Sequence, residues 1–211
     1  MNSWRTYTSE RPYLKTEGAT QQYILDRLGA CIDQFFSFEK PIRPQRTRLI
    51  KETLTLLGHQ KLPEKKQYKV YSHGLSQELC QEHGGEFKNV EWLYDLHWYT
   101  EVPGEDFMTN ELPLVVECEW NPRFRNDPRI PYGGIKYDFQ KLLVTNAELR
   151  LMIFIIKKDC DLERLDDYFE KAIDNYQHLR KDAKFLFVAY DEQIKGFHYT
   201  EKRKRPHPND T

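Results

Sequence analysis

Hydrophobic residues recur at the spacing of an amphipathic helix in several segments of the 211-residue chain. These patterns predict helices at 19–38, 45–58, 75–83, 137–144 and 161–181. Shorter runs rich in β-branched and aromatic residues predict strands at 67–73, 91–100, 112–120, 149–156, 184–190 and 193–200. Because helices precede, interrupt and follow the strands, this order predicts an α/β fold with a mixed central sheet flanked by helices, plus additional N-terminal helices.

Capping and turn-forming residues indicate where several of these elements end. Pro44 separates the first two helices, and Gly58 is the expected C-terminal cap of the second. Gly133-Gly134 interrupts the chain before the helix at 137–144. Asp161 is the expected N-cap of the last helix, because its carboxylate can accept hydrogen bonds from free backbone N–H groups.

Two carboxylates stand at the end of a strand that otherwise has the composition of a buried one. Glu117 and Glu119 follow three hydrophobic residues, and side chains two apart on a strand share a face about 7 Å apart. Two negative charges held at the end of an apolar strand are costly unless a cation lies between them. The pair therefore predicts a hard divalent metal bound by oxygen ligands, the alternative being an exposed strand end with two solvated glutamates.

A third carboxylate is expected beside this pair. The segments 91–100 and 112–120 predict an antiparallel hairpin joined by a long connection. The even-numbered positions of the first strand are the more apolar, so they are expected to face the core while Asp95 projects from the other face. Asp95 then lies beside Glu117 and Glu119, and the three carboxylates together predict a Mg²⁺ site.

This arrangement resembles the PD-(D/E)XK nuclease superfamily. The residues that carry the resemblance are Asp95, the string Glu117-Cys118-Glu119-Trp120-Asn121 at a strand end, a helix that begins near Asp138, and a hydrophobic strand after it. The family pattern is Asp on one strand and (Asp/Glu)-x-Lys on the next, here in a Glu-x-Glu form. The resemblance covers roughly residues 85–160 and implies the restriction-endonuclease-like αβββαβ core.

The resemblance also implies a chemistry. The protein is expected to be a Mg²⁺-dependent endonuclease acting on DNA, with Mn²⁺ able to substitute, and Asp95, Glu117 and Glu119 as metal ligands. Glu119 replaces the family lysine and would accept a proton from water or bind a second metal. Lys141 is the candidate replacement cation. Its alternative is a solvated lysine paired with Asp138, three residues before it on the same helical face.

Basic residues next to the acids are candidates for binding substrate phosphates. Arg123, Arg125 and Arg129 follow the Glu-x-Glu string in a proline-containing loop, and a guanidinium suits bidentate phosphate recognition. His97 shares a strand face with Asp95 and would contact a phosphate or a metal-bound water. The alternatives are a solvated loop for the arginines and a structural sheet histidine for His97.

Charge and cysteine content narrow the class of protein. The net charge of −1 argues against nonspecific coating of nucleic acid, although Lys65-Lys66 and Lys202–Arg205 form local basic runs. Long apolar runs and an apolar leader are absent from the sequence, which predicts a protein of the cytoplasm that does not enter a membrane. Its cysteines are scattered, which suits reduced thiols: Cys31, Cys80, Cys118 and Cys160.

The expected organisation is a polar arm, an N-terminal helical region packed on the core, a nuclease-like α/β core and a basic tail, at 1–18, 19–84, 85–200 and 201–211. Two functions follow from the sequence. The first is the metal-dependent endonuclease, with DNA as partner and a homodimer expected if both strands are cut. The second is a catalytically inactive nuclease-like module that binds nucleic acid or another protein, because the motif lysine is missing.

Overall fold

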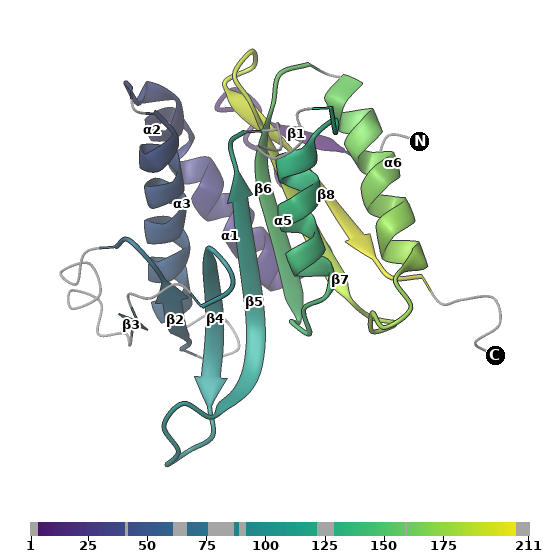
Figure 1. Cartoon of the computed structure of the whole chain (residues 1–211). Coiled ribbons are helices and arrows are strands. Elements are labelled where there is room, and N and C mark those ends of the chain that lie inside the picture. Colours follow the sequence, from purple (N-terminus) through teal and green to yellow (C-terminus); the bar gives the residue numbers. More distant parts are fainter. Residues whose placement is uncertain are drawn as a thin grey trace.

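The chain forms an α/β fold built on one mixed sheet with helices on both faces (Figure 1). The computed structural model describes residues 4–40, 42–60, 67–75, 87–88, 92–121, 129–158 and 160–205. Within these ranges the sheet has eight strands in the order β1-β8-β7-β6-β5-β4-β2-β3. The fold class predicted from the order of hydrophobic patterns is therefore confirmed.

The predicted bounds of strand β6, 149–156, agree with the structure, whereas several other elements begin or end elsewhere. The helices are α1 (Ala19–Ala30), α2 (Ile32–Ser37), α3 (Ile42–His59), α5 (Gly133–Leu143) and α6 (Cys160–Asn175). The strands are β1 (Arg5–Tyr7), β2 (Lys69–Ser72), β3 (Phe87–Lys88), β4 (Leu96–Glu101), β5 (Thr109–Glu119), β6 (Leu149–Ile156), β7 (Lys184–Asp191) and β8 (Gly196–Arg203).

The sheet changes from antiparallel to parallel pairing at β5. Strands β2, β4 and β5 pair antiparallel, and the β4–β5 hairpin extends beyond the helices (Figure 1). Helix α5 then connects β5 to its parallel neighbour β6, and α6 connects β6 to the parallel strand β7. At the other edge of the sheet, β8 pairs antiparallel with β7, and β1 pairs antiparallel with β8. This change of direction places the carboxyl end of β5 beside the beginning of α5.

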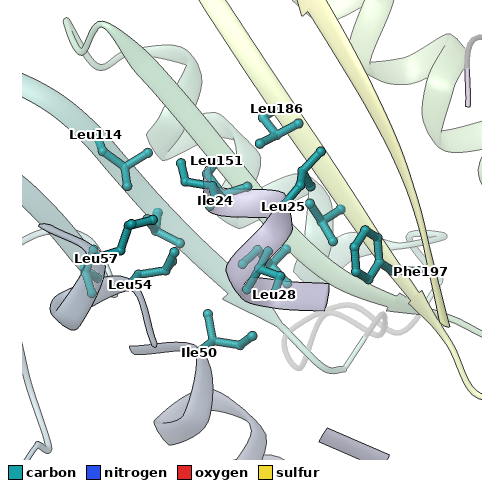
Figure 2. Close-up of a cluster of buried hydrophobic side chains, with 14 of the residues drawn as sticks. Ile24, Leu25, Leu28, Ile50, Leu54, Leu57, Leu114, Leu151, Leu186 and Phe197 are labelled. Atoms are coloured by element: carbon teal, nitrogen blue, oxygen red, sulfur yellow. The ribbon is translucent and has the colours of Figure 1, made fainter. Parts of the chain in front are cut away.

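Hydrophobic side chains from α1 and α3 cover one face of the sheet. Figure 2 shows side chains of both helices meeting those of β5, β6, β7 and β8; its labelled residues are Ile24, Leu25, Leu28, Ile50, Leu54, Leu57, Leu114, Leu151, Leu186 and Phe197. All ten are buried. Burial of a leucine or isoleucine side chain contributes about 1.5–3 kcal/mol, so this layer is a principal source of stability.

The opposite face is covered by α5 and α6. Phe139 of α5 and Phe169 of α6 lie 4.8 Å apart between ring centroids, and Phe169 stacks on Phe187 of β7. Residues of β6 alternate between the two layers, with Ile153 on the α1–α3 side and Phe154 on the α5–α6 side. Every residue of β6 is buried, as its nearly unbroken hydrophobic run predicts.

Tertiary contacts change three of the predicted helix ends. The segment 19–38 divides into α1 and α2 at Cys31, and α3 begins at Ile42 with Pro44 in its first turn, where proline is tolerated. Gly58 lies inside α3 and is not a cap. A Cβ there would come within 2.6 Å of the Trp98 indole Nε1, so glycine is required by the close approach of β4.

The predicted boundaries of α5 and α6 also need correction. Gly133-Gly134 begins α5, which therefore starts before the predicted segment 137–144. Asp161 lies inside the first turn of α6 and its carboxylate accepts the N–H groups of Lys157 and Lys158, so it stabilises the preceding turn. Helix α6 ends at Asn175, before the predicted residue 181, and the Lys204 ammonium donates hydrogen bonds to the Ile173 and Asp174 carbonyls of its last turn.

Both ends of the chain contribute to the sheet where the sequence predicts an arm and a tail. Arg5–Tyr7 pairs antiparallel with β8, and β8 itself continues to Arg203. Within the tail, Lys202 pairs with Asp166 at 2.8 Å. The basic run therefore has structural partners in its described part. The predicted helix at 75–83 lies almost wholly outside the described residues, as does the Lys65-Lys66 run.

Strand β4 begins at Leu96, so the predicted strand 91–100 starts too early. Leu96 and Trp98 face the α1–α3 layer, whereas Tyr94 packs on the α5–α6 side. The expectation that all even-numbered positions face one core is therefore wrong before Leu96, where the chain is not yet extended.

Among the described helices, none is long and apolar enough to cross a membrane.

Candidate functional site

Four carboxyl groups and two lysines converge around the carboxyl end of β5. Leu96 pairs with Val116, so Asp95, just before β4, comes opposite Glu117 on β5. Helix α5 starts beside the end of β5 and supplies two further charged residues, Asp138 and Lys141. Ligand sites in α/β sheets typically lie at the carboxyl ends of parallel strands, next to helix N-termini. The structure thus brings the predicted Asp95, Glu117 and Lys141 into one place.

Glu117 is the most deeply buried of these groups. Its side chain is 2% exposed, and Oε2 accepts a hydrogen bond from Lys141 Nζ at 3.0 Å. The other oxygen, Oε1, is buried and has no hydrogen-bond partner among the described residues. A buried carboxylate oxygen without a partner costs free energy, so this atom needs a proton or a cation that the protein itself does not supply.

The electrostatic environment raises the pKa of this side chain. Burial, followed by the nearby charge of Asp95, raises the pKa of Glu117 from 4.5 to about 9. Lys141 opposes this rise but does not cancel it. For Lys141, burial alone lowers the pKa, but the charges of Glu117 and Asp138 outweigh it and raise the pKa above its ordinary value. A shift of this size on a buried acid is typical of functional sites.

Asp95 is held by groups from two different elements. Its Oδ2 accepts the backbone N–H of Cys118 at 2.8 Å, and its Oδ1 pairs with Lys51 Nζ of α3 at 3.2 Å. The Cys118 bond fixes Asp95 against β5, one residue from Glu117. Lys51 is a site residue that the sequence does not reveal, because its contact with Asp95 joins residues 44 positions apart in the chain.

Asp138 is the second site residue that the sequence analysis missed as a member of the cluster. Its Oδ1 lies 2.9 Å from Lys141 Nζ, so that lysine bridges Asp138 and Glu117 at once. The sequence left two alternatives for Lys141: a replacement for the motif cation, or a solvated lysine paired with Asp138. The structure contains the Asp138 pair and also a contact with Glu117, and the pair is only partly exposed. Burial, and more weakly the charge of Asp95, raises the pKa of Asp138.

Glu119 lies apart from the Lys141 contact, nearer the start of α5. Its Oε1 accepts the backbone N–H of Asn121 at 2.5 Å. Its Oε2 lies so near Gly134 that a Cβ there would approach it at 2.8 Å. Burial raises the pKa of Glu119, while the positive charge of Arg43 partly offsets this. Glu119 therefore faces the junction of β5 and α5.

His97 does not lie at a surface where a phosphate would arrive. Its ring is buried and stacks on Tyr71 with ring centroids 4.8 Å apart. Burial lowers the pKa of His97 to about 4, and neither ring nitrogen has a hydrogen-bond partner in the part of the chain that the structure describes. This environment supports the structural alternative for His97, a neutral ring packed within an aromatic cluster.

Two of the three arginines predicted to bind phosphate lie outside the described residues, and the third is described. Arg123 and Arg125 lie outside the described residues. Arg129 is exposed in the turn that leads into α5, close in sequence to Gly133. The predicted phosphate-binding role of these residues remains a prediction.

The donor atoms suit a hard cation with few protein ligands. Across the described ranges, no group of three or more His, Cys, Asp or Glu side chains is arranged to hold a metal ion. Mg²⁺, however, usually keeps several waters and binds through one or two carboxylates plus substrate phosphates. Asp95 and Glu117 have the donor chemistry for that smaller requirement, and Glu117 Oε1 has no partner among the described residues. Both Asp95 oxygens already have contacts, one with the Cys118 N–H group and one with Lys51 Nζ.

Comparisons with known proteins do not assign the chain to a family. No protein-family model matches it, and no curated protein and no solved structure matches it either. The geometry of the site is therefore the basis for a functional proposal.

Proposed function

We propose that the protein is a Mg²⁺-dependent endonuclease that hydrolyses phosphodiester bonds of nucleic acid, with DNA as the expected substrate. The observation that carries this proposal is Glu117, a buried carboxyl held against Lys141 and beside Asp95, one of whose oxygens has no partner among the described residues. A buried carboxylate without a partner lowers stability. Such groups occur in functional sites, where a bound cation compensates their charge.

The order of elements supports the same proposal. If the two-residue strand β3 is left out, helix α3, the antiparallel strands β2, β4 and β5, helix α5 and the parallel strand β6 have the order αβββαβ. That is the core order of the PD-(D/E)XK nucleases that the motif resembles. Glu117 lies near the end of β5, as the family pattern requires, whereas Asp95 lies one residue before β4 and not on the strand itself.

The protein's own groups have distinct tasks in this reaction. When bound, Mg²⁺ supplies a Lewis acid for the phosphoryl oxygen and lowers the pKa of a coordinated water. Asp95 and Glu117 would hold it. Lys141, oriented by Asp138, places a positive charge where the phosphate gains negative charge and thus takes the part of the missing motif lysine. Glu119, with a pKa raised by burial, is the group to accept a proton.

The test is cleavage of supercoiled plasmid, single-stranded DNA and RNA by the purified protein with Mg²⁺, Mn²⁺ or EDTA. Glu117→Gln and Lys141→Met should abolish metal-dependent nicking. Glu201→Gln is the control, because Glu201 is a half-buried acid whose pKa is also raised by burial, but it lies on β8. Equal activity of wild type and Glu117→Gln would reject the proposal.

A catalytically inactive nuclease-like module is the second candidate, favoured by Glu119 standing where the family has lysine. Binding of DNA or RNA, measured by fluorescence anisotropy, without cleavage in the presence of any metal would support it.

The endonuclease proposal includes a homodimer for cutting both strands, which light scattering would test. A reducing, cytoplasmic location is also proposed, supported by free thiols at Cys31, Cys118 and Cys160.

A further inference from the structure

A buried chain of hydrogen bonds joins the residue before Asp95 to the backbone of Lys141. The Tyr94 hydroxyl contacts Thr145 Oγ1, and Thr145 Oγ1 in turn contacts the carbonyl oxygen of Lys141 at 2.9 Å. Tyr94 and Thr145 are both buried. Because the Lys141 carbonyl can only accept, Thr145 donates its single hydroxyl hydrogen there, and the Tyr94 hydroxyl must donate to Thr145.

Arg150 of β6 holds the same end of α5 from another direction. Its guanidinium is buried, and it donates from Nε to the Leu142 carbonyl at 3.1 Å and from Nη2 to the Thr145 carbonyl. The Leu142 carbonyl also accepts the backbone N–H of Thr145 at 3.3 Å, so Arg150 is a second donor there. Thr145 lies just beyond the end of α5, and Arg150 donates to its carbonyl as well. The end of α5 is thus attached to the segment before β4 through Tyr94 and to β6 through Arg150.

The attachment determines where the Lys141 side chain points. Each residue turns an α-helix by about 100°, so a small rotation of α5 about its axis would move the ammonium away from Glu117. The bond to the Lys141 carbonyl fixes the rotation of that residue, and Tyr94 ties it to the chain segment that carries Asp95. The same connection therefore orients the cation and one of the acids relative to each other.

We infer that Tyr94, Thr145 and Arg150 are positioning residues that set the Lys141 ammonium against Glu117 and Asp95. The expected effect of these residues on cleavage rests on the proposed nuclease function. Their effect on the position of the Lys141 ammonium rests on the contacts alone. None of the three needs to touch substrate.

The experiment compares three substitutions with a matched control. Thr145→Val keeps the volume and removes the hydroxyl, Tyr94→Phe removes only the other hydroxyl, and Thr145→Ser keeps the bond. Tyr168→Phe is the control. The Tyr168 hydroxyl accepts a hydrogen bond from Gln140 Nε2 of α5 at 2.7 Å, and it takes no part in the connection from Tyr94 to the Lys141 carbonyl.

Two readouts separate positioning from general stability. In cleavage assays, Thr145→Val and Tyr94→Phe should lower kcat by about 10- to 100-fold with little change in KM, because a small misplacement of a catalytic group has that effect. Thr145→Ser and Tyr168→Phe should retain wild-type kcat. The NMR signal of the Lys141 ammonium, assigned with Lys141→Arg, should shift in Thr145→Val and Tyr94→Phe, and should stay unchanged in the other two.

The two readouts also distinguish failure of the inference from failure of the proposed function. If wild type cleaves no substrate, the nuclease proposal fails and the ammonium signal alone decides the inference. An unchanged signal in both Thr145→Val and Tyr94→Phe would overturn it. A kcat loss in Tyr168→Phe equal to that in Tyr94→Phe would also overturn it, because general loosening of α5 would then explain the effect.

Discussion

Replacing Glu117 by glutamine should stabilise the protein while removing its proposed activity. Glu117 is buried, and its pKa is raised from 4.5 to about 9 by burial and by Asp95. Between these two pH values the folded protein keeps a proton that the unfolded chain loses. Stability therefore falls as pH rises through this window, and the full contribution is present only below about pH 4.5.

The size of the effect follows from the shift. One pKa unit corresponds to 1.36 kcal/mol, so by pH 7 the carboxyl lowers the free energy of unfolding by about 3 kcal/mol. Glutamine cannot ionise and retains an oxygen for Lys141. Its amide N–H group is left unpaired near the position of Oε1, which costs about 1–3 kcal/mol. The net expectation at pH 7 is a gain of about 1 kcal/mol, rising with pH.

Urea unfolding of wild type and Glu117→Gln at pH 5.5, 6.5 and 7.5 measures this directly. The advantage of the glutamine variant should grow by about 1.4 kcal/mol for each pH unit. A difference that does not depend on pH, or a variant that becomes less stable as pH rises, would refute the reasoning. Either result would mean that Glu117 is ionised and stabilised by Lys141.

Three further outcomes are expected from other parts of the molecule. Burial lowers the pKa of His97 to about 4, so below pH 6.5 the unfolded chain binds a proton that the folded protein excludes. The free energy of unfolding should therefore fall by about 3 kcal/mol between pH 6.5 and pH 4. Urea unfolding of His97→Phe should not show this loss. Gly134→Ala should lower stability by about 1–3 kcal/mol despite alanine's helix propensity, because its Cβ would lie 2.5 Å from the Asn121 carbonyl oxygen; an unchanged melting temperature would contradict this. Lys51→Met should leave Asp95 without its ammonium partner and change the Mg²⁺ affinity measured by calorimetry, whereas Lys171→Met, on the exposed side of α6, should not.

The sequence alone determined the layers of the fold and the candidate acids. The hydrophobic run 149–156 predicts a strand buried on both faces, because both helical layers need an apolar surface to pack on. The Glu-x-Glu spacing predicts two acids at the end of one strand, and the hairpin predicts Asp95 beside them. These features depend on periodicity within a short segment, which is visible in a sequence.

Only the tertiary structure decided which charges meet. Lys51 contacts Asp95 across the junction of α3 and β4, and Lys141 bridges Asp138 and Glu117, although helical spacing relates it only to Asp138. Tertiary packing also placed Gly58 inside α3, where the Trp98 ring leaves no room for a Cβ. Such contacts depend on the rotation and separation of packed elements, and neither is encoded in the local pattern of hydrophobic and polar residues.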